Sequence, residues 1–269
     1  MQVESGAFDG NMWTLSTPVG PIRARMVINA GGLYGDVIDR MLLGETDFEI
    51  RPRKGQFVVF DKPASGLVRH ILLPVPSATT KGVVVCRTIF GNLLVGPTAE
   101  EQSARDVAEL VPETLEALRQ RGAEMLPGLA GMEVTAIYAG LRPASQFKDY
   151  RIKRHEGRNF ITIGAIRSTG LTASLGIARH VFDLYAESLA TPPVALSEPV
   201  WPAVPNLAEY RQRAWQRAGH GGIVCHCERV ARSEIEAALA GPIPVQSAGG
   251  LKRRTRSMLG RCQCFYCMA

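Results

Sequence analysis

Residues 160–178 read F-I-T-I-G-A-I-R-S-T-G-L-T-A-S-L-G-I-A, an apolar run followed by small and polar residues. The first part, Phe160–Ile163, has the length and composition of a buried strand. Ser168–Thr172 then begins a helix that we expect to continue to about Leu189, because apolar residues recur every three or four positions. The first N–H groups of such a helix can bind an anion or a dipole, or they can accompany nothing more than tight strand–helix packing.

The same order of strand, small residues and helix occurs near the N-terminus. Residues 1–25 alternate between apolar and polar positions, which predicts a hairpin. Met26–Asn29 follows as a buried strand, and a short helix is expected near Asp36–Leu43. We expect the buried face of the later helix to consist of apolar residues at helical spacing, namely Leu171, Leu175, Ala178, Phe182, Tyr185 and Leu189.

The middle of the chain has a different pattern. Short β-runs separated by Gly, Pro and charged turns predict an antiparallel sheet, with strands at Phe57–Phe60, Ile71–Leu73, Val83–Val85, Leu93–Val95 and Val134–Tyr138. A helical pattern covers Ser103–Leu126 with a break at Pro112. Together these elements predict a mixed α/β (α+β) fold that includes an antiparallel sheet in need of a packing partner.

Composition sets limits on the class of protein. The chain has 269 residues, of which 46% are hydrophobic and 21% charged, which is typical of globular proteins. We find no apolar run of about 18 residues, the minimum for a membrane span, and no signal peptide. The formal net charge is +6. Basic residues do not alternate with aromatic ones, so nucleic-acid binding is not expected. Cysteine usage favours a reducing compartment, and we expect the cytoplasm, with the inner membrane surface as a place of peripheral association.

Five of the six cysteines lie near the C-terminus, in V-C-H-C-E and in G-R-C-Q-C-F-Y-C; they are Cys225, Cys227, Cys262, Cys264 and Cys267. Thiolates gathered at one point repel each other unless a cation neutralises them, which predicts zinc or an iron–sulfur cluster. Structural zinc usually takes C-x2-C pairs, whereas the pairs here are C-x-C and, taking Cys262 with Cys267, C-x4-C. Disulfide frameworks belong to small secreted domains. Zinc and disulfides remain the alternatives.

Charge around these cysteines fits a negatively charged cluster. Residues 219–269 carry seven Lys or Arg against three Glu, which is +4 of the chain's +6. Nearby cations stabilise an iron–sulfur cluster and tune its potential. The same charges can form a solvated face or attract an acidic partner.

The two cysteine segments, together with G-G-L-K-R-R-T-R-S-M-L-G-R-C-Q, resemble the bacterioferritin-associated-ferredoxin-type [2Fe-2S] domain. That resemblance implies that Cys225, Cys227, Cys262 and Cys267 are the cluster ligands. Cys264 stands where that family usually has glycine, so its role is open. His226, between two cysteines, is expected to be an ordinary surface or core residue, with a place beside the ligands or an unusual ligand role as the alternatives.

Three further motifs resemble those of the D-amino-acid-oxidase-type flavoprotein superfamily: V-I-N-A-G-G-L-Y-G-D, A-G-L-R-P-A-S and I-T-I-G-A-I-R-S-T-G-L-T-A-S-L-G-I-A. The branch they resemble includes FAD-dependent glycerol-3-phosphate dehydrogenases and 2-hydroxyacid oxidases. The resemblance implies FAD contacts from Asn29, Ala30, Gly31, Gly170, Leu171 and Thr172. It also implies that Arg142 binds the anionic group of the substrate, which a guanidinium can grip through two parallel hydrogen bonds. Arg167 and Lys148 are further candidates to line that pocket.

The superfamily's G-x-G-x-x-G turn, which cradles the FAD pyrophosphate, does not occur in these 269 residues. We therefore expect either a fragment or a chain whose N-terminal FAD-binding half comes from a second polypeptide, and weak FAD binding by this chain alone. The expected segments are part of a Rossmann-like FAD-binding domain (1–48), a substrate or cap domain (49–154), a return to the FAD-binding domain (155–190), a linker (191–218) and a small helical [2Fe-2S] domain (219–269).

The predicted function is an FAD-dependent dehydrogenase that oxidises glycerol 3-phosphate and passes electrons through a [2Fe-2S] cluster to a quinone or carrier protein. A 2-hydroxyacid or an amino acid is the alternative substrate. A non-catalytic iron–sulfur electron-transfer subunit of a two-chain flavoenzyme is the alternative from a different class.

Overall fold

Residues 2–76, 82–191, 193–199 and 212–268 are described by a computed structural model of the protein. Their contacts divide the chain into two units. The first unit consists of Met1–Gly55, Ala99–Leu110 and Ala139–Leu196, and the second of Gln56–Thr98, Val111–Tyr138 and Ser197–Ala269. These units are defined by contacts between residues and not by function. The domain boundaries expected from the sequence therefore stay a prediction.

The first unit opens with an antiparallel meander of β1 (Ser5–Phe8), β2 (Trp13–Ser16) and β3 (Ile22–Ala24), which confirms the predicted hairpin. Trp13 is fully buried and packs with Leu42 and Phe160. Its indole N–H donates to the Arg158 carbonyl at 2.8 Å. Trp13 is therefore a large buried side chain, with its polar atom satisfied, that helps to hold the meander to the rest of the unit.

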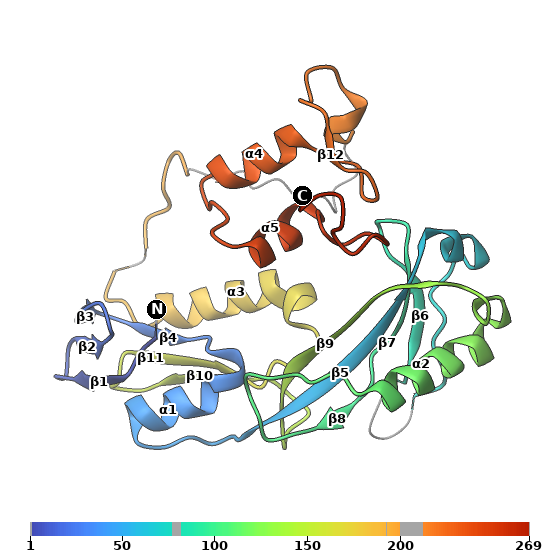
Figure 1. The fold of residues 1–269 in the computed structure, drawn as a ribbon. Coiled ribbons are helices and arrows are strands. Elements are labelled where there is room, and N and C mark those ends of the chain that lie inside the picture. Colours follow the sequence, from blue (N-terminus) through green and yellow to red (C-terminus); the bar gives the residue numbers. More distant parts are fainter. Residues whose placement is uncertain (1, 77–81, 192, 200–211, 269) are drawn as a thin grey trace. The chain divides into compact units, whose positions relative to one another are not determined.

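A three-stranded sheet forms the centre of the first unit. β4 (Val27–Asn29) runs parallel to β11 (Phe160–Gly164), and β10 (Arg151–His155) is antiparallel to β11. A 3-10 turn, η1 (Gly32–Tyr34), leads from β4 into α1 (Gly35–Leu43). Figure 1 shows α1 and α3 (Gly170–Ala186) on opposite faces of this sheet. The strand–helix order predicted from both motifs is confirmed.

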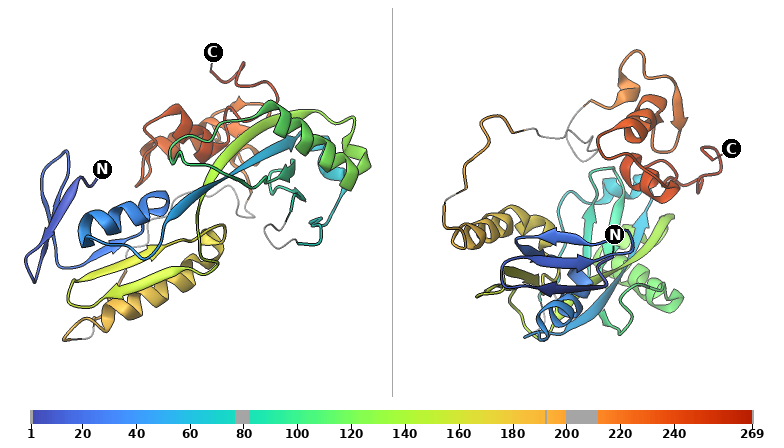
Figure 2. Two further views of the ribbon diagram at one scale, coloured as in Figure 1. Left: turned by 90° about the horizontal axis from the view of Figure 1, so that it is seen from below. Right: turned by 90° about the vertical axis from the view of Figure 1, so that its left-hand side faces the viewer.

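The burial of α3 differs from the expectation, because apolar residues predicted to be buried are exposed. Leu171 is 96% exposed, Leu175 is 85% exposed and Phe182 is 47% exposed, while Val181 is the buried residue of this helix. The left view of Figure 2 shows α3 beside the strands of the first unit. Periodicity correctly grouped the apolar residues on one side of the helix, but it does not determine whether another element covers that side.

The second unit contains the antiparallel sheet. β5 (Ile50–Phe60) starts in the first unit, where its Arg53 and Lys54 pair with β8 (Glu100–Glu101). Its last residues pair with β7 (Leu93–Gly96), which pairs with β6 (Val84–Arg87). β9 (Val134–Ser145) also pairs with β5. Both long strands exceed their predicted lengths, and Ile71–Leu73 is not a strand: Leu72 forms one isolated bridge with Val85.

Helix α2 (Pro112–Met125) covers this sheet together with η2 (Lys62–Leu67) and η3 (Pro127–Leu129). The helical pattern expected from Ser103 was wrong before Pro112: proline occupies the first turn of α2, where its missing N–H is not needed. The core of the unit is built from apolar residues of these elements, namely Val58, Phe60, Ala64, Val85, Leu93, Val95, Leu118 and Leu129.

The cysteine-containing part of the second unit, called the cysteine module below, covers residues 212–268. It contains η4 (Ala214–Gln216), β12 (Ile223–Cys225), β13 (Val230–Ala231), α4 (Arg232–Ala240) and α5 (Ala248–Thr255). Figure 1 shows α4 and α5 beside each other. Much of the predicted linker, residues 192 and 200–211, lies outside the described residues. Within the described ranges, no helix combines the length and the apolar character needed to cross a membrane.

Candidate functional site

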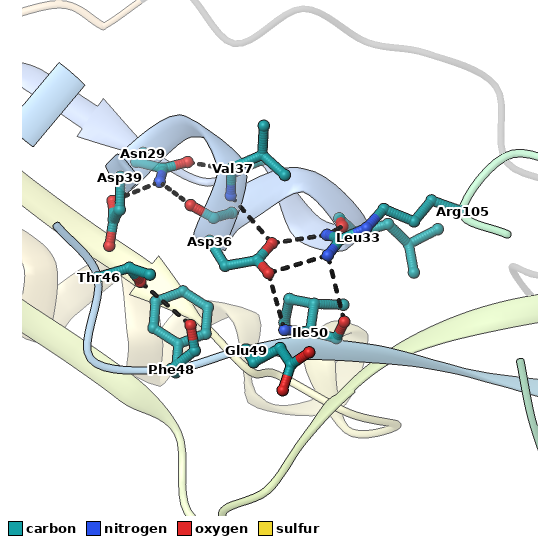
Figure 3. Close-up of polar contacts among 12 residues, drawn as sticks. Asn29, Leu33, Asp36, Val37, Asp39, Thr46, Phe48, Glu49, Ile50 and Arg105 are labelled. Carbon is teal, nitrogen blue, oxygen red and sulfur yellow. Dashed lines mark hydrogen bonds and ion pairs between the residues drawn. The ribbon is translucent and has the colours of Figure 1, made fainter. Parts of the chain in front are cut away.

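The first predicted cofactor segment, Asn29–Gly31, lies at the end of β4. Asn29 is buried; its amide nitrogen donates to the Gly35 carbonyl at 2.8 Å and to Asp39 Oδ1 at 2.7 Å. Its amide oxygen accepts from the Gly31 N–H at 3.0 Å. Figure 3 shows this side chain facing α1. Asn29 therefore shapes the turn, and the neighbouring backbone is what the turn presents outward.

Glycine is favoured at two positions of this turn. A Cβ on Gly31 would lie 2.4 Å from Ile38 Cδ1, and Gly32 has a φ of +56°, which L residues seldom adopt. Gly31 lines a pocket of about 770 Å³ together with Val3, Tyr34 and Met41. A pocket of this size is in the range of small-molecule and cofactor sites.

The second predicted cofactor segment, Gly170–Thr172, begins α3. Because β4 and β11 are parallel neighbours, the loops after them leave the same edge of the sheet. The N-cap residue Thr169 makes no side-chain cap bond to the helix; its hydroxyl instead contacts the hydroxyl of Tyr150. The first N–H groups of α3 have no acceptor inside the helix. The two predicted segments thus share one edge of one sheet within the first unit.

A buried ion pair that sequence reasoning missed supports this edge. Asp36, 1% exposed, accepts two bonds from Arg105 at 2.6 and 2.9 Å and one from the Ile50 N–H at 3.0 Å. Arg105 also donates to the Leu33 carbonyl, as Figure 3 shows. Burial alone would raise the pKa of Asp36, but Arg105 and the backbone N–H groups outweigh it and hold that pKa below its ordinary value.

Asp39 forms the centre of a second network. Both of its oxygens are 2.9 Å from the Thr162 hydroxyl, which is also 2.9 Å from His155 Nε2. Burial raises the pKa of Asp39, while Asn29 and Thr162 oppose that change. Burial also lowers the pKa of His155, although the nearby Asp39 carboxylate acts to raise it. His155 is therefore a hydrogen-bonded side chain that links β10 to β11.

The predicted substrate residue, Arg142, lies on β9. Its guanidinium donates from Nε to the Arg53 carbonyl at 3.3 Å and from one terminal nitrogen to the Lys54 carbonyl at 3.1 Å. Burial, with a smaller contribution from Arg53, lowers the pKa of Arg142. These contacts to β5 fix where the guanidinium lies.

Other cations lie near the start of β5. Arg53 pairs with Glu101, and Arg167 also helps to hold the pKa of Glu101 below its ordinary value, after the larger effect of Arg53. Arg167 Nε is buried and has no hydrogen-bond partner among the described residues. A buried, unsatisfied cationic donor favours an anionic ligand. Lys148 is exposed.

In the cysteine module the predicted ligands lie in two pairs. Burial raises the pKa of Cys225, to which the Cys267 thiol contributes, while the N–H groups of Glu228 and Met258 oppose it. The Cys262 N–H favours the thiolate of Cys227, but burial and the Cys262 thiol outweigh it and raise that pKa. Backbone N–H groups, first that of Tyr266, lower the pKa of Cys262.

These loops are tightly built. A Cβ on Gly260 would lie 2.1 Å from Cys227 Cβ. Cys264 has a φ of +67°, which glycine adopts most easily, and its carbonyl lies 3.9 Å from Cys267 Sγ. His226 is exposed.

Sulfur donors together with N–H groups directed at them are the donor set of an iron–sulfur site. Across the described ranges, however, no three His, Cys, Asp or Glu side chains are already arranged to hold a metal ion. The chemistry of the residues fits a cluster, while their arrangement is that of two thiol pairs.

Comparison with known proteins adds independent information. The model of the family described as FAD dependent oxidoreductase matches residues 2–184. A glycerol 3-phosphate dehydrogenase of Caloramator mitchellensis is 31% identical over 255 residues, which cover 90% of this chain and 52% of that protein. A glycine oxidase of Pseudomonas aeruginosa is 32% identical over 132 residues, covering 49% of this chain and 33% of that protein.

Among solved structures, the FAD-bound L-alpha-glycerophosphate oxidase of Mycoplasma pneumoniae is similar, with a TM-score of 0.58 and 26% identity. That match covers 68% of this chain and 50% of the oxidase. The chain spans about half the length of the first curated relatives it matches.

Proposed function

The chain belongs to the FAD-dependent oxidoreductase family, and from this premise we propose that it is part of a dehydrogenase that oxidises glycerol 3-phosphate. The observation that carries the substrate class is the guanidinium of Arg142, fixed by two carbonyls of β5. A guanidinium suits a phosphate or a carboxylate group. Arg167, whose Nε has no hydrogen-bond partner among the described residues, is the second cation of the first unit that we propose for the same anion.

FAD, when bound, would accept a hydride from the substrate carbon. The residues that fit it are the glycine turn at Gly31 and the helix start at Gly170–Thr172. The turn allows close approach because Gly31 has no side chain, and the helix start offers N–H donors with a positive dipole end. Arg142 would bind the anionic end of the substrate and so fix which hydrogen faces the flavin.

Anaerobic flavin reduction tests the substrate. The protein is isolated with any flavoprotein chain that co-purifies, and the visible absorption of its flavin is followed after addition of glycerol 3-phosphate, lactate or glycine. Glycerol 3-phosphate is expected to bleach the flavin fastest. A carboxylate can also pair with one guanidinium, so a 2-hydroxyacid or amino acid is the second candidate, favoured if lactate or glycine reacts faster.

We further propose that Cys225, Cys227, Cys262 and Cys267 hold a [2Fe-2S] cluster that carries electrons to a quinone or a carrier protein. The two thiol pairs and the N–H groups directed at their sulfurs support this. Iron and sulfide analysis with EPR of the dithionite-reduced protein tests it. A colourless protein that holds one zinc ion would contradict the cluster.

A non-catalytic iron–sulfur subunit of a two-chain flavoenzyme is the candidate from another class, and the cysteines gathered in residues 225–267 favour it. In that case a second chain supplies the flavin site, and we expect the complex to act in the cytoplasm at the inner membrane surface. Cluster reduction by glycerol 3-phosphate only after a flavoprotein partner is added would favour the subunit. The same reduction with FAD alone would favour a catalytic chain.

A further inference from the structure

Glu228 directly follows Cys227, and its carboxylate is buried between two cations of the second unit. Its side chain is 4% exposed; Oε1 is 3.3 Å from Lys62 Nζ, and Oε2 accepts from Arg256 Nε at 2.9 Å. Lys62 belongs to η2, outside the cysteine module, whereas Arg256 ends α5 within it. One carboxylate therefore joins the cysteine module to the sheet part of the unit.

The turn between β6 and β7 completes this arrangement. Lys62 Nζ also donates to the Phe90 carbonyl at 3.0 Å, and the Arg256 guanidinium lies 3.8 Å from the centre of the Phe90 ring. Arg256 has a φ of +68°, so its backbone is in a conformation that L residues seldom adopt. Such a conformation persists where surrounding contacts determine it.

Two more contacts follow the same boundary. Arg261, one residue before Cys262, pairs with Asp61, which is one residue before Lys62. Gln263, one residue after Cys262, donates to the Thr135 carbonyl of β9 at 2.8 Å. Both cysteine segments are thus bound to the sheet part by residues next to the thiols.

We propose that Glu228 is a positioning residue: through Lys62 and Arg256 it fixes the loop that carries Cys225 and Cys227 against η2 and the β6–β7 turn. A carboxylate this buried has lost its hydration, and its cationic partners compensate for that loss. The Glu228 N–H is also directed at the Cys225 sulfur, so a shift of Glu228 moves a thiol. The structural role of Glu228 does not depend on the proposed cluster. Its functional consequence, a fixed position for the electron carrier, rests on that proposed function.

Hydrogen exchange measured by mass spectrometry on the full chain tests the proposal. In Lys62→Met we expect exchange of residues 223–228 to accelerate by roughly tenfold, because removing one cation from the buried carboxylate favours local opening. Lys62→Arg, which keeps the charge, is expected to restore protection. Arg87→Met, which removes an exposed cation of β6, is the matched control and should leave these residues unchanged. Equal exchange in Lys62→Met and Arg87→Met would overturn the proposal.

Glu228→Gln and Glu236→Gln form a second matched pair, since Glu236 pairs with Arg232 on the exposed face of α4. We expect the first to loosen residues 223–228 and the second to have no effect. The double variant of Lys62→Met with Glu228→Gln should loosen the loop by less than the sum of the two single effects. Additive effects would overturn the pairing. Iron is measured on the same samples. Protein without iron that still shows the non-additive exchange of Lys62→Met and Glu228→Gln refutes only the cluster. Protein with iron in which the two effects on exchange are additive refutes only the role of Glu228.

Discussion

Asp36 connects several elements of the first unit through its carboxylate, which its position in the sequence does not indicate. Its carboxylate accepts bonds from Arg105 and from the N–H groups of Ile50 and Val37. It thereby ties the first turn of α1 to the start of β5 and to a loop 69 residues away. A carboxylate with this many donors is stable only in its ionised form.

Asp36→Asn should lower the free energy of unfolding at neutral pH by about 3 kcal/mol, because it leaves Arg105 without its buried counter-charge. The folded pKa of Asp36 lies below its ordinary value of 3.8, so its stabilisation is complete above that pH and is lost as the pH falls through the folded pKa. Urea unfolding of both proteins should therefore show a gap at pH 7 that narrows in acid.

Asp183→Asn is the matched control for that experiment. Its carboxylate is 48% exposed and pairs with Arg179, which is 79% exposed. Surface pairs of this kind contribute at most about 1 kcal/mol. An Asp36→Asn protein as stable as the Asp183→Asn protein would show that the Arg105 contact is energetically minor.

Arg142→Lys tests the proposed substrate contact at the scale of a single side chain. Lysine keeps the charge but cannot bind the Arg53 and Lys54 carbonyls and an anion in the same planar geometry. We expect kcat/KM for glycerol 3-phosphate to fall by roughly 100-fold. Steady-state assays with a dye acceptor give the value, and Arg121→Met, at an exposed arginine of α2, should change it less than about twofold. An unchanged Arg142→Lys enzyme would remove Arg142 from the site.

At the scale of elements, local patterns predicted the strands and helices around the site. Strand composition and the glycines after β4 and β11 are short-range signals, so α1, α3 and both strands were found. Arg105 was placed in a predicted helix and its pairing with Asp36 was missed, because that contact depends on residues far apart in sequence. The positive φ of Cys264 was likewise missed, because a cysteine in the sequence does not indicate a left-handed backbone.

Two leucines that both fit a helical apolar pattern differ in burial. Leu118 of α2 is 3% exposed, whereas Leu171 of α3 is 96% exposed. Leu118→Ala should cost about 2–5 kcal/mol through lost burial and the remaining cavity. Leu171→Ala should change the free energy of unfolding by less than about 0.5 kcal/mol. Thermal or urea unfolding of the purified chain distinguishes them, and similar losses in the two variants would mean that the outer face of α3 is covered.

At the scale of the whole molecule, the cysteines link segments that are far apart in the chain. The Cys225 thiol neighbours that of Cys267, and the Cys227 thiol neighbours that of Cys262; all four cysteines are free. Each neighbouring pair therefore takes one thiol from each segment. Ser replacement at any one of these four should abolish most of the bound iron and the visible spectrum. Cys264→Ser and Cys86→Ser are the controls and should retain both. Loss of iron in Cys264→Ser alone would show that the ligands are a different set of cysteines.

FAD binding also depends on parts of the molecule that lie far apart in sequence. Gly31 and Gly170 offer backbone at one edge of a sheet, but the turn that cradles a pyrophosphate does not occur in the 269 residues. A flavin held only from that edge loses the contacts to its phosphates. We therefore expect fluorescence titration of this chain alone to show no saturation at submicromolar FAD, and a chain containing G-x-G-x-x-G to raise the affinity when added. Submicromolar binding by the isolated chain would mean that other residues hold the phosphates.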